Sequence, residues 1–205
     1  MKEVIHYFDY KSPYAYLAQA ANDDLESRFD CRVVRVPYTL QIGDYLGEAA
    51  LDDRGQDTLG TRNPHQWRRV RYSYMDCRRE ANRRGLIIRG PRKIWNTDLV
   101  HSGFLFATTR GDFRAFHAEV FRRFWQRELD VENPAVIEAL LAECGLPATE
   151  FMPYAAGEGA ARLAELRNEA ETRGVFGVPS WWVDGQLYWG AERLCRVEEH
   201  LVPTT

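Results

Sequence analysis

Residues 4–17 read VIHYFDYKSPYAYL and place a strand pattern directly before a helix start. Val4 to Phe8 is a run of aromatic and β-branched residues with few charges, which predicts a strand. Ser12-Pro13 supplies a capping residue and then proline at the first helical position, which predicts that a helix begins there. A second β-favouring run, Arg32 to Val36, comes next. The chain is therefore expected to open as a strand–helix–strand unit with two parallel strands.

The long middle of the chain, between about Thr39 and Gly174, shows no strand pattern. Its apolar residues recur at spacings of three and four, which predicts amphipathic helices. These helices are expected at 64–84, 98–109, 113–124, 136–144, from about 147, and at 160–173.

The end of the chain returns to strand patterns. Ser180 to Val183 and Gln186 to Trp189 are expected to form two strands, joined by a hairpin turn at Asp184-Gly185. Ala191 to Leu201 is expected to form a closing helix. This order of elements predicts the α/β class and, within it, a thioredoxin-like fold with an inserted all-helical domain.

The length of 205 residues fits one large domain or one domain with an insertion. The thioredoxin-like domain is expected to comprise residues 1–40 and 174–205 together with the helix at about 160–173. Residues 41–159 are expected to form the inserted helical domain. The hydrophobic content of 45% and the aromatic content of 13% are sufficient for a sizeable core.

Several classes of function are excluded by composition. The 27 basic and 30 acidic residues give a net charge of −3, which argues against a dedicated nucleic-acid binder. No apolar run is long enough to span a bilayer, and the first residues lack an apolar signal segment, so a cytoplasmic protein without membrane contact is expected. The four cysteines and five histidines lack metal-ligand spacing and any Cys-x-x-Cys pair, so neither a metal site nor a disulfide framework is expected.

Three segments that are distant in sequence could carry chemistry if they converge in the fold. The first is Ser12, at a helix start where free N–H groups and the helix dipole favour a negative charge such as a thiolate. A serine cannot exchange disulfides, but its hydroxyl can donate a hydrogen bond to a sulfur brought by a cofactor. The alternative is that Ser12 only caps the helix.

The second segment is Val178-Pro179, directly before a predicted strand. A cis peptide bond is expected there, with the backbone of Val178 free to pair with an extended peptide such as glutathione; the alternative is a simple turn. The third segment begins at Gly190, where the backbone of Ala191 and the carboxylate of Glu192 could hold the charged end of a peptide. The alternative for Glu192 is compensation of the helix dipole.

Together these segments resemble a known family. Phe8 to Leu17, with its Phe-Asp-x-x-Ser-Pro-Tyr pattern, is similar to the opening of the kappa-class glutathione transferases and, more closely, of the 2-hydroxychromene-2-carboxylate isomerases. Arg62-Asn63-Pro64, Gly174 to Pro179 and Gly190 to Arg193 are similar to other motifs of that family, which is part of the DsbA-like thioredoxin superfamily. Relatives often carry a hydroxyl or amide residue and then Asp where this chain has Ala191-Glu192.

The resemblance implies glutathione as cofactor and a homodimer as the assembly. It implies that Ser12 hydrogen-bonds and activates the glutathione sulfur. The tripeptide would be bound by Asn63, Val178 and Pro179, with Ala191 and Glu192 at its γ-glutamyl end. The implied activity is cis–trans isomerisation of an unsaturated aromatic carboxylate through reversible addition of the thiolate to a conjugated alkene.

The arginines form a separate feature. Residues 62–93 contain ten Arg and one Lys against two acidic residues, so that 11 − 2 = +9. We interpret most of them as a solvated helix face, with Arg62, Arg92 and also Trp182 as candidates for binding an aryl carboxylate. Two alternatives remain for the function: a kappa-like glutathione transferase or peroxidase, and a non-catalytic protein that uses the basic helical insert to bind a partner.

Overall fold

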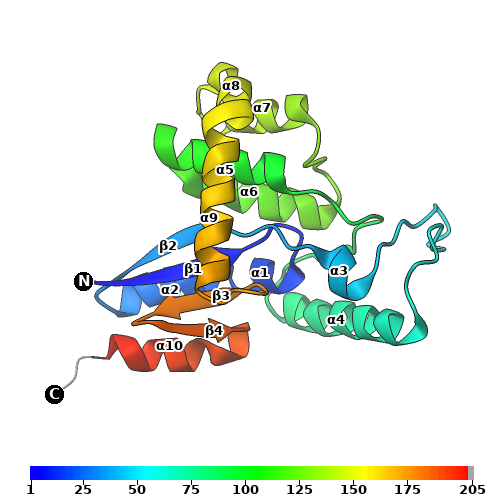
Figure 1. Ribbon diagram of the computed structural model, residues 1–205, viewed down its shortest axis with the longest axis horizontal. Helices are drawn as coiled ribbons and strands as arrows, with labels where there is room; N and C mark the ends of the chain where they lie inside the picture. Colours follow the sequence, from blue (N-terminus) through cyan, green and yellow to red (C-terminus); the bar gives the residue numbers. More distant parts are fainter. Residues whose placement is uncertain (203–205) are drawn as a thin grey trace.

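The centre of the protein is a four-stranded sheet, seen in a computed structural model that describes residues 1–202 (Figure 1). The strand order is β2-β1-β3-β4. The strands are β1 (Lys2–Phe8), β2 (Cys31–Pro37), β3 (Ser180–Val183) and β4 (Gln186–Trp189). β1 and β2 are parallel, with Val4 opposite Val33, and β3 is antiparallel to β1, with His6 opposite Trp181. The two expected opening strands and their parallel pairing are confirmed.

The first helix differs from the expectation because it is divided in two. α1 (Pro13–Leu17) and α2 (Gln19–Arg28) meet at Ala18. The N–H of Ala18 is shared between the carbonyls of Tyr14 and Ala15, so the chain tightens at this point before α2 continues. The closing helix also differs at its start: a 3-10 turn (η3, Ala191–Arg193) precedes α10 (Leu194–Leu201).

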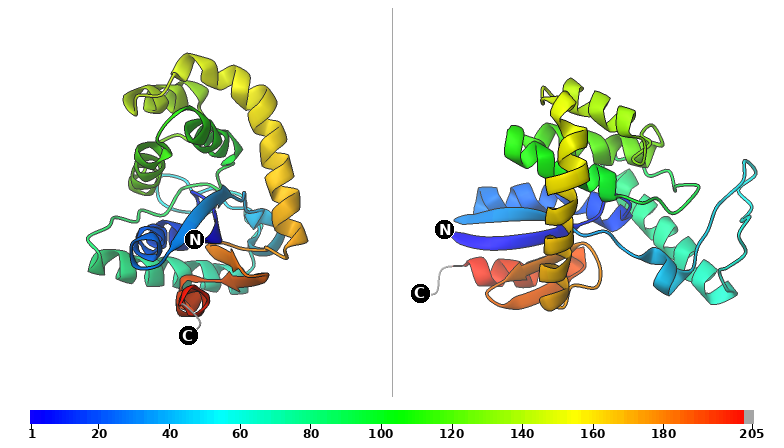
Figure 2. Two further views of the ribbon diagram at one scale, coloured as in Figure 1. Left: turned by 90° about the vertical axis from the view of Figure 1, so that its left-hand side faces the viewer. Right: turned by 45° about the horizontal axis from the view of Figure 1, so that its top comes forward.

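Helices cover both faces of the sheet (Figure 2). α2 and α10 share one face, where Val4, Val33 and Trp181 form a small core with residues of both helices. α9 (Ala160–Thr172) crosses the other face and contacts β2.

The remaining elements lie between β2 and α9 in sequence. They are α3 (Ile42–Leu46), α4 (Pro64–Arg83), α5 (Asp98–Arg110), α6 (Phe113–Gln126), α7 (Pro134–Glu143), η1 (Ala148–Glu150), α8 (Phe151–Tyr154) and the π-helical turn η2 (Ala155–Gly159). Within residues 1–202 no strand interrupts this helical segment, as the sequence predicts. α4 lies beyond the end of the sheet beside α1, and α5, α6 and α7 stack beyond β2 (Figure 1).

One hydrophobic core joins the sheet to the helical segment. Phe8 and Tyr10, at the end of β1, are fully buried and pack against Phe104 of α5 and Phe121 of α6. The aromatic residues of the helical segment therefore fix the position of the β1–α1 connection, which carries Ser12.

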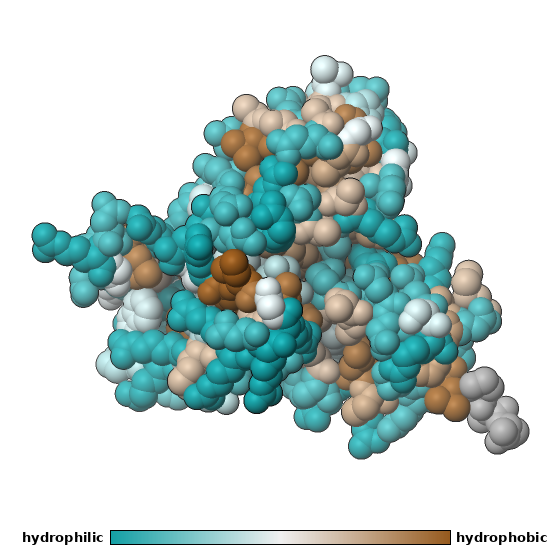
Figure 3. All heavy atoms as spheres, turned by 180° about the vertical axis from the view of Figure 1, so that it is seen from behind, coloured by the Kyte–Doolittle hydropathy of each residue, from teal (hydrophilic) through white to brown (hydrophobic). Residues whose placement is uncertain are grey.

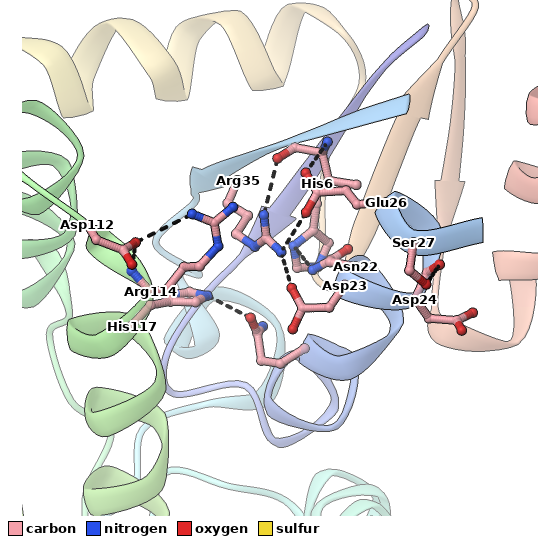
Figure 4. Close-up of polar contacts among 12 residues, drawn as sticks. His6, Asn22, Asp23, Asp24, Glu26, Ser27, Arg35, Asp112, Arg114 and His117 are labelled. Carbon is pink, nitrogen blue, oxygen red and sulfur yellow. Dashed lines mark hydrogen bonds and ion pairs between the residues drawn. The ribbon is translucent and has the colours of Figure 1, made fainter. Parts of the chain in front are cut away.

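Polar contacts reinforce this junction (Figure 4). His117 of α6 hydrogen-bonds to the Gln19 side chain of α2 at 2.6 Å and to the Tyr10 hydroxyl at 2.8 Å. On β2, the buried Arg35 pairs with Asp23 of α2 at 2.7 Å. These contacts fix the positions of α2, β2 and α6 around the end of β1.

The face of the molecule opposite to that of Figure 1 is mostly hydrophilic. Figure 3 shows that hydrophilic residues dominate it and that apolar residues appear in small groups. No helix of the described residues is long and apolar enough to cross a membrane.

Candidate active site

Ser12 lies at the N-terminus of α1 and has two hydrogen bonds. Its Oγ accepts from the N–H of Ala15 at 3.2 Å, so the predicted cap is confirmed. The same hydroxyl donates to the carbonyl of Val178 at 3.4 Å, which joins two residues 166 positions apart. The long second distance marks a weak bond. The hydroxyl is therefore available to a better acceptor placed beside it.

The Val178-Pro179 peptide bond is cis, as expected. The carbonyl of Pro179 accepts from the N–H of Gly190 at 2.9 Å, which brings the η3 turn next to this loop. Within residues 1–202 the N–H of Val178 donates no backbone hydrogen bond. The Val178 carbonyl accepts from the Ser12 hydroxyl. Ala191 and Glu192 stand exposed on the adjacent turn, and the Glu192 carboxylate folds back over Gly190.

A cavity of about 580 Å³ opens beside Ser12 and Val178. Its walls come from the start of α1, from α3 and the segment after it, from α4, and from residues 90–95. Trp189 of β4, half exposed, completes the wall next to Val178. The cavity is mainly apolar in its side chains, with Trp67, Tyr74 and Trp95 contributing aromatic rings.

All charged side chains of the cavity wall are basic. They are Lys11, Arg62, Arg71, Arg78, Arg92, Lys93 and Arg127. Three of them have carboxylate partners: Lys11 pairs with Asp9, Arg92 with Asp53 and Lys93 with Glu132. Among the described residues the other four have no carboxylate within 4.0 Å. A cavity with excess positive charge and apolar walls suits a ligand that combines an aromatic body with an anionic group.

The predicted substrate residues are only partly brought together. Arg62 and Arg92 line the cavity, as the hypothesis requires. Trp182 does not: it points to the α9 face of the sheet, where the Arg173 guanidinium lies 5.9 Å from its ring. This is a correction to the expectation, and its cause is position along the strands. Trp189 lies opposite Ser180, at the end of β3 next to Val178, and lines the cavity, whereas Trp182 is two residues further along β3.

Asn63 is the N-cap of α4 and stands next to Arg62 outside the cavity wall. Its Oδ1 accepts from the N–H of Gln66 at 2.9 Å, and the Gln66 side chain accepts in return from the Asn63 N–H at 2.9 Å. This capping box fixes one oxygen of Asn63 and leaves its amide N–H groups for another partner.

Sequence reasoning missed Lys11 and its buried ion pair. The Lys11 ammonium lies 3.0 Å from Asp9 Oδ2 and 3.1 Å from Thr97 Oγ1, and both charged side chains are almost fully buried. Burial alone would raise the pKa of Asp9, but the charge of Lys11 and the hydrogen bond from the Leu40 N–H bring it below its ordinary value. The pair anchors the backbone directly before Ser12. The sequence signal that could have identified this ion pair is the position of two oppositely charged residues, one on each side of Tyr10, at the end of an aromatic strand.

The cysteines take no part in the site. Cys31, Cys77, Cys144 and Cys195 are all free thiols, and none lines the cavity. Burial raises the pKa of the Cys77 thiol to about 11, so it remains protonated at neutral pH. Within the described part of the chain, no group of three or more His, Cys, Asp or Glu residues is placed to hold a metal ion.

Comparison with known proteins agrees with this arrangement. The sequence profile of the DSBA-like thioredoxin domain family matches residues 3–202. The protein belongs to this family, and both the expected resemblance and the expected fold class are confirmed.

Within the family, the chain is similar to proteins of one name. It is 28% identical over 204 residues to 2-hydroxychromene-2-carboxylate isomerase of Sphingobium xenophagum, covering 98% of each chain. It is 26% identical over 196 residues to a protein of that name from Pseudomonas putida, covering 94% of this chain and 90% of the relative. Named isomerases that match over nearly the whole chain support an enzyme of this group.

Solved structures share the fold. A 2-hydroxychromene-2-carboxylate isomerase superposes with a TM-score of 0.72 at 21% identity, covering 96% of this chain and 93% of the other. A probable DsbA oxidoreductase from Streptomyces coelicolor gives a TM-score of 0.72 at 21% identity, covering 100% of this chain and 93% of the other.

Proposed function

We propose that the protein is a glutathione-dependent cis–trans isomerase of an unsaturated aromatic carboxylate, similar in activity to 2-hydroxychromene-2-carboxylate isomerase. The observation that carries the proposal is the position of the Ser12 hydroxyl, at a helix N-terminus, 3.4 Å from the Val178 carbonyl and on the wall of a basic, aromatic cavity. The similarity to proteins named isomerases over nearly the whole chain supports it.

The residues present suit glutathione. A peptide of this kind needs backbone partners, a place for its sulfur and cations for its carboxylates. The N–H of Val178 offers the first, the Ser12 hydroxyl the second, and the basic cavity wall the third. Of the predicted contacts, Asn63 and Glu192 lie at the edges of this arrangement and would complete it from outside the cavity wall.

Glutathione supplies a thiol that can add to a conjugated alkene, allow rotation about the bond that has become single, and leave again unchanged. A free cysteine thiol has a pKa of about 8.5, so at neutral pH the thiolate needs stabilisation. Ser12 provides it by donating its proton in a hydrogen bond, with the N-terminus of α1 adding a favourable dipole. The basic cavity wall binds the carboxylate of the substrate and holds the alkene beside that sulfur position.

The same site could serve a kappa-like transferase or peroxidase that consumes glutathione. The two activities differ in stoichiometry, which gives the test. Purified protein is mixed with 2-hydroxychromene-2-carboxylate and glutathione at about one hundredth of the substrate concentration, and the isomers and free thiol are quantified.

The proposal expects many molecules of product for each glutathione, with the thiol recovered, and no reaction when glutathione is omitted. Consumption of one glutathione per product would establish a transferase instead. Turnover without glutathione would contradict the proposed role of the cofactor. We further propose, from the resemblance alone, that the enzyme is a cytoplasmic homodimer.

A further inference from the structure

Tyr74 of α4 presents an unpartnered hydroxyl at the cavity. The residue lines the cavity wall and is half-buried. Among residues 1–202 its hydroxyl forms no hydrogen bond to another residue, whereas the Tyr14 hydroxyl beside the same helix binds Asp76 at 3.0 Å. A tyrosine in such a place usually finds a partner. The space in front of this hydroxyl is therefore a place where a ligand acceptor gains a hydrogen bond.

Two arginines meet Tyr74 at Gly90. A methyl group built on Gly90 would lie 3.4 Å from the Tyr74 ring and 3.5 Å from an Arg78 Nη atom, so both side chains close on this glycine. The Arg78 guanidinium is 5.7 Å from the centre of the Tyr74 ring. Arg127 reaches the same point, since its Nε donates to the Gly90 carbonyl at 2.8 Å.

Both guanidinium groups keep free donors. Arg78 uses Nε for the Ile88 carbonyl at 3.3 Å, and Arg127 uses Nε and one Nη for the Gly90 carbonyl. An arginine has five N–H donors, so each retains at least two for another acceptor. In the described chain neither has a carboxylate within 4.0 Å.

Arg62 adds a third cation to this wall. Its Nε donates to the Gly47 carbonyl at 3.1 Å, and its guanidinium lies 5.0 Å from the Trp67 ring. Burial lowers the pKa of Arg62, and the more distant charges of Asp57 and Glu48 offset this only in part. Burial also raises the pKa of Tyr74 to about 12 despite the three nearby arginines, so its hydroxyl keeps its proton and can donate.

We infer that Arg62, Tyr74, Arg78 and Arg127 form a carboxylate-binding subsite on the α4 wall of the cavity, which we call the Tyr74 subsite. Planar guanidinium forks and a phenol match the two in-plane oxygens of a carboxylate. A bound carboxylate would also offset the partly buried positive charge of Arg62. The inference rests on the proposed function in one respect: the carboxylate is taken to belong to the aromatic substrate or to glutathione.

The test uses cinnamate as the probe and cinnamamide as its uncharged counterpart, titrated into the full-length protein by isothermal titration calorimetry. The variant is Arg78→Gln. The matched control is Arg79→Gln on the same helix, because Arg79 is exposed and lies outside the cavity wall. Its one side-chain hydrogen bond among residues 1–202 is to the Met75 sulfur. A charge-assisted hydrogen bond contributes about 1.5–3 kcal/mol, which corresponds to a change in affinity of roughly 10- to 100-fold.

The subsite predicts that wild type binds cinnamate at least about tenfold more tightly than cinnamamide. Arg78→Gln should weaken cinnamate binding by about tenfold or more and leave cinnamamide unchanged, whereas Arg79→Gln should match wild type. Tyr74→Phe, which keeps the ring against Gly90, should lower cinnamate affinity by several fold. This variant keeps the test valid if Arg78→Gln loosens the loop at Ile88.

Titration with glutathione separates the two sources of the carboxylate. If Arg78→Gln weakens glutathione and not cinnamate, the subsite holds a carboxylate of glutathione; the reverse result assigns it to the aromatic ligand. Equal binding of cinnamate and cinnamamide to wild type, together with unchanged glutathione affinity in Arg78→Gln, would overturn the subsite. Discrimination between the two probes by a protein that does not bind glutathione would retain the subsite and refute the proposed function.

Discussion

Replacing Ser12 by alanine separates its structural role from its chemical one. The variant loses the cap formed with the Ala15 N–H at 3.2 Å and the weak bond to the Val178 carbonyl at 3.4 Å. A lost N-cap costs about 0.5–2 kcal/mol of the free energy of unfolding. Because the bond to Val178 is long and adds little, we expect a loss of about 1 kcal/mol, or a fall in Tm of roughly 2–4 °C.

The chemical effect should be larger than the effect on stability. A hydrogen bond to a charged acceptor contributes about 1.5–3 kcal/mol, so its loss should raise the pKa of bound glutathione thiol by roughly 1–2 units. If the hydrogen bond acts mainly on the reacting state, turnover should fall by roughly 10²-fold. The assay follows the ultraviolet absorbance of the thiolate against pH, with glutathione bound to each protein.

Asn133→Ala is the matched control. Asn133 is the N-cap of α7, precedes a proline as Ser12 does, and its side chain accepts from the Ala135 N–H at 3.0 Å. It lies outside the cavity wall. This variant should lose a similar amount of stability and keep the thiol titration and turnover of wild type. Identical titrations and turnover in wild type and Ser12→Ala would refute the chemical role and leave Ser12 as a helix cap.

Three further outcomes are expected. Asp9→Asn leaves the buried ammonium of Lys11 without its carboxylate and should lower the free energy of unfolding in urea by about 3–5 kcal/mol; a loss below about 1 kcal/mol would contradict the ion pair's role. Burial lowers the pKa of His6 to about 3 and of His101 to about 4, so each stays neutral in the folded protein while the unfolded chain takes up a proton below the ordinary pKa of 6.5. Stability should therefore be full above pH 6.5 and fall steadily below it, by about 2 kcal/mol per histidine at pH 5, and a flat profile in denaturation experiments from pH 7 to 5 would count against this. Duplex DNA should not bind tightly at physiological salt, because several cations of residues 62–93 face the cavity; salt-sensitive, sub-micromolar binding in fluorescence anisotropy would disagree.

The sequence predicts the features that depend on neighbouring residues. Ser12-Pro13 specifies a helix start through local chemistry, and the structure contains it. Asp184 and Gly185 both have positive φ angles, 48° and 80°, so the expected hairpin follows from the turn residues themselves. The order of strands and helices along the chain followed from the patterns that surround such signals.

Features that depend on how the strands pair were harder to predict. Trp182 was a candidate for the cavity, but it lies two residues beyond Ser180 on β3. Trp189 pairs with Ser180 at the end of the sheet next to Val178 and lines the cavity instead. Trp67 and Tyr74 lie on the apolar stripe of α4, and they are half-buried because that stripe forms the cavity wall. A helical period identifies an apolar face but does not say whether protein or ligand covers it.

The most direct test of the account is the structure of the protein crystallised with glutathione. The account predicts that the glutathione sulfur lies within hydrogen-bond distance of the Ser12 hydroxyl and that the peptide backbone pairs with Val178. The Ser12 hydroxyl should then turn from the Val178 carbonyl, 3.4 Å away, to the sulfur. Glutathione bound elsewhere, or bound with its sulfur away from Ser12, would contradict the account.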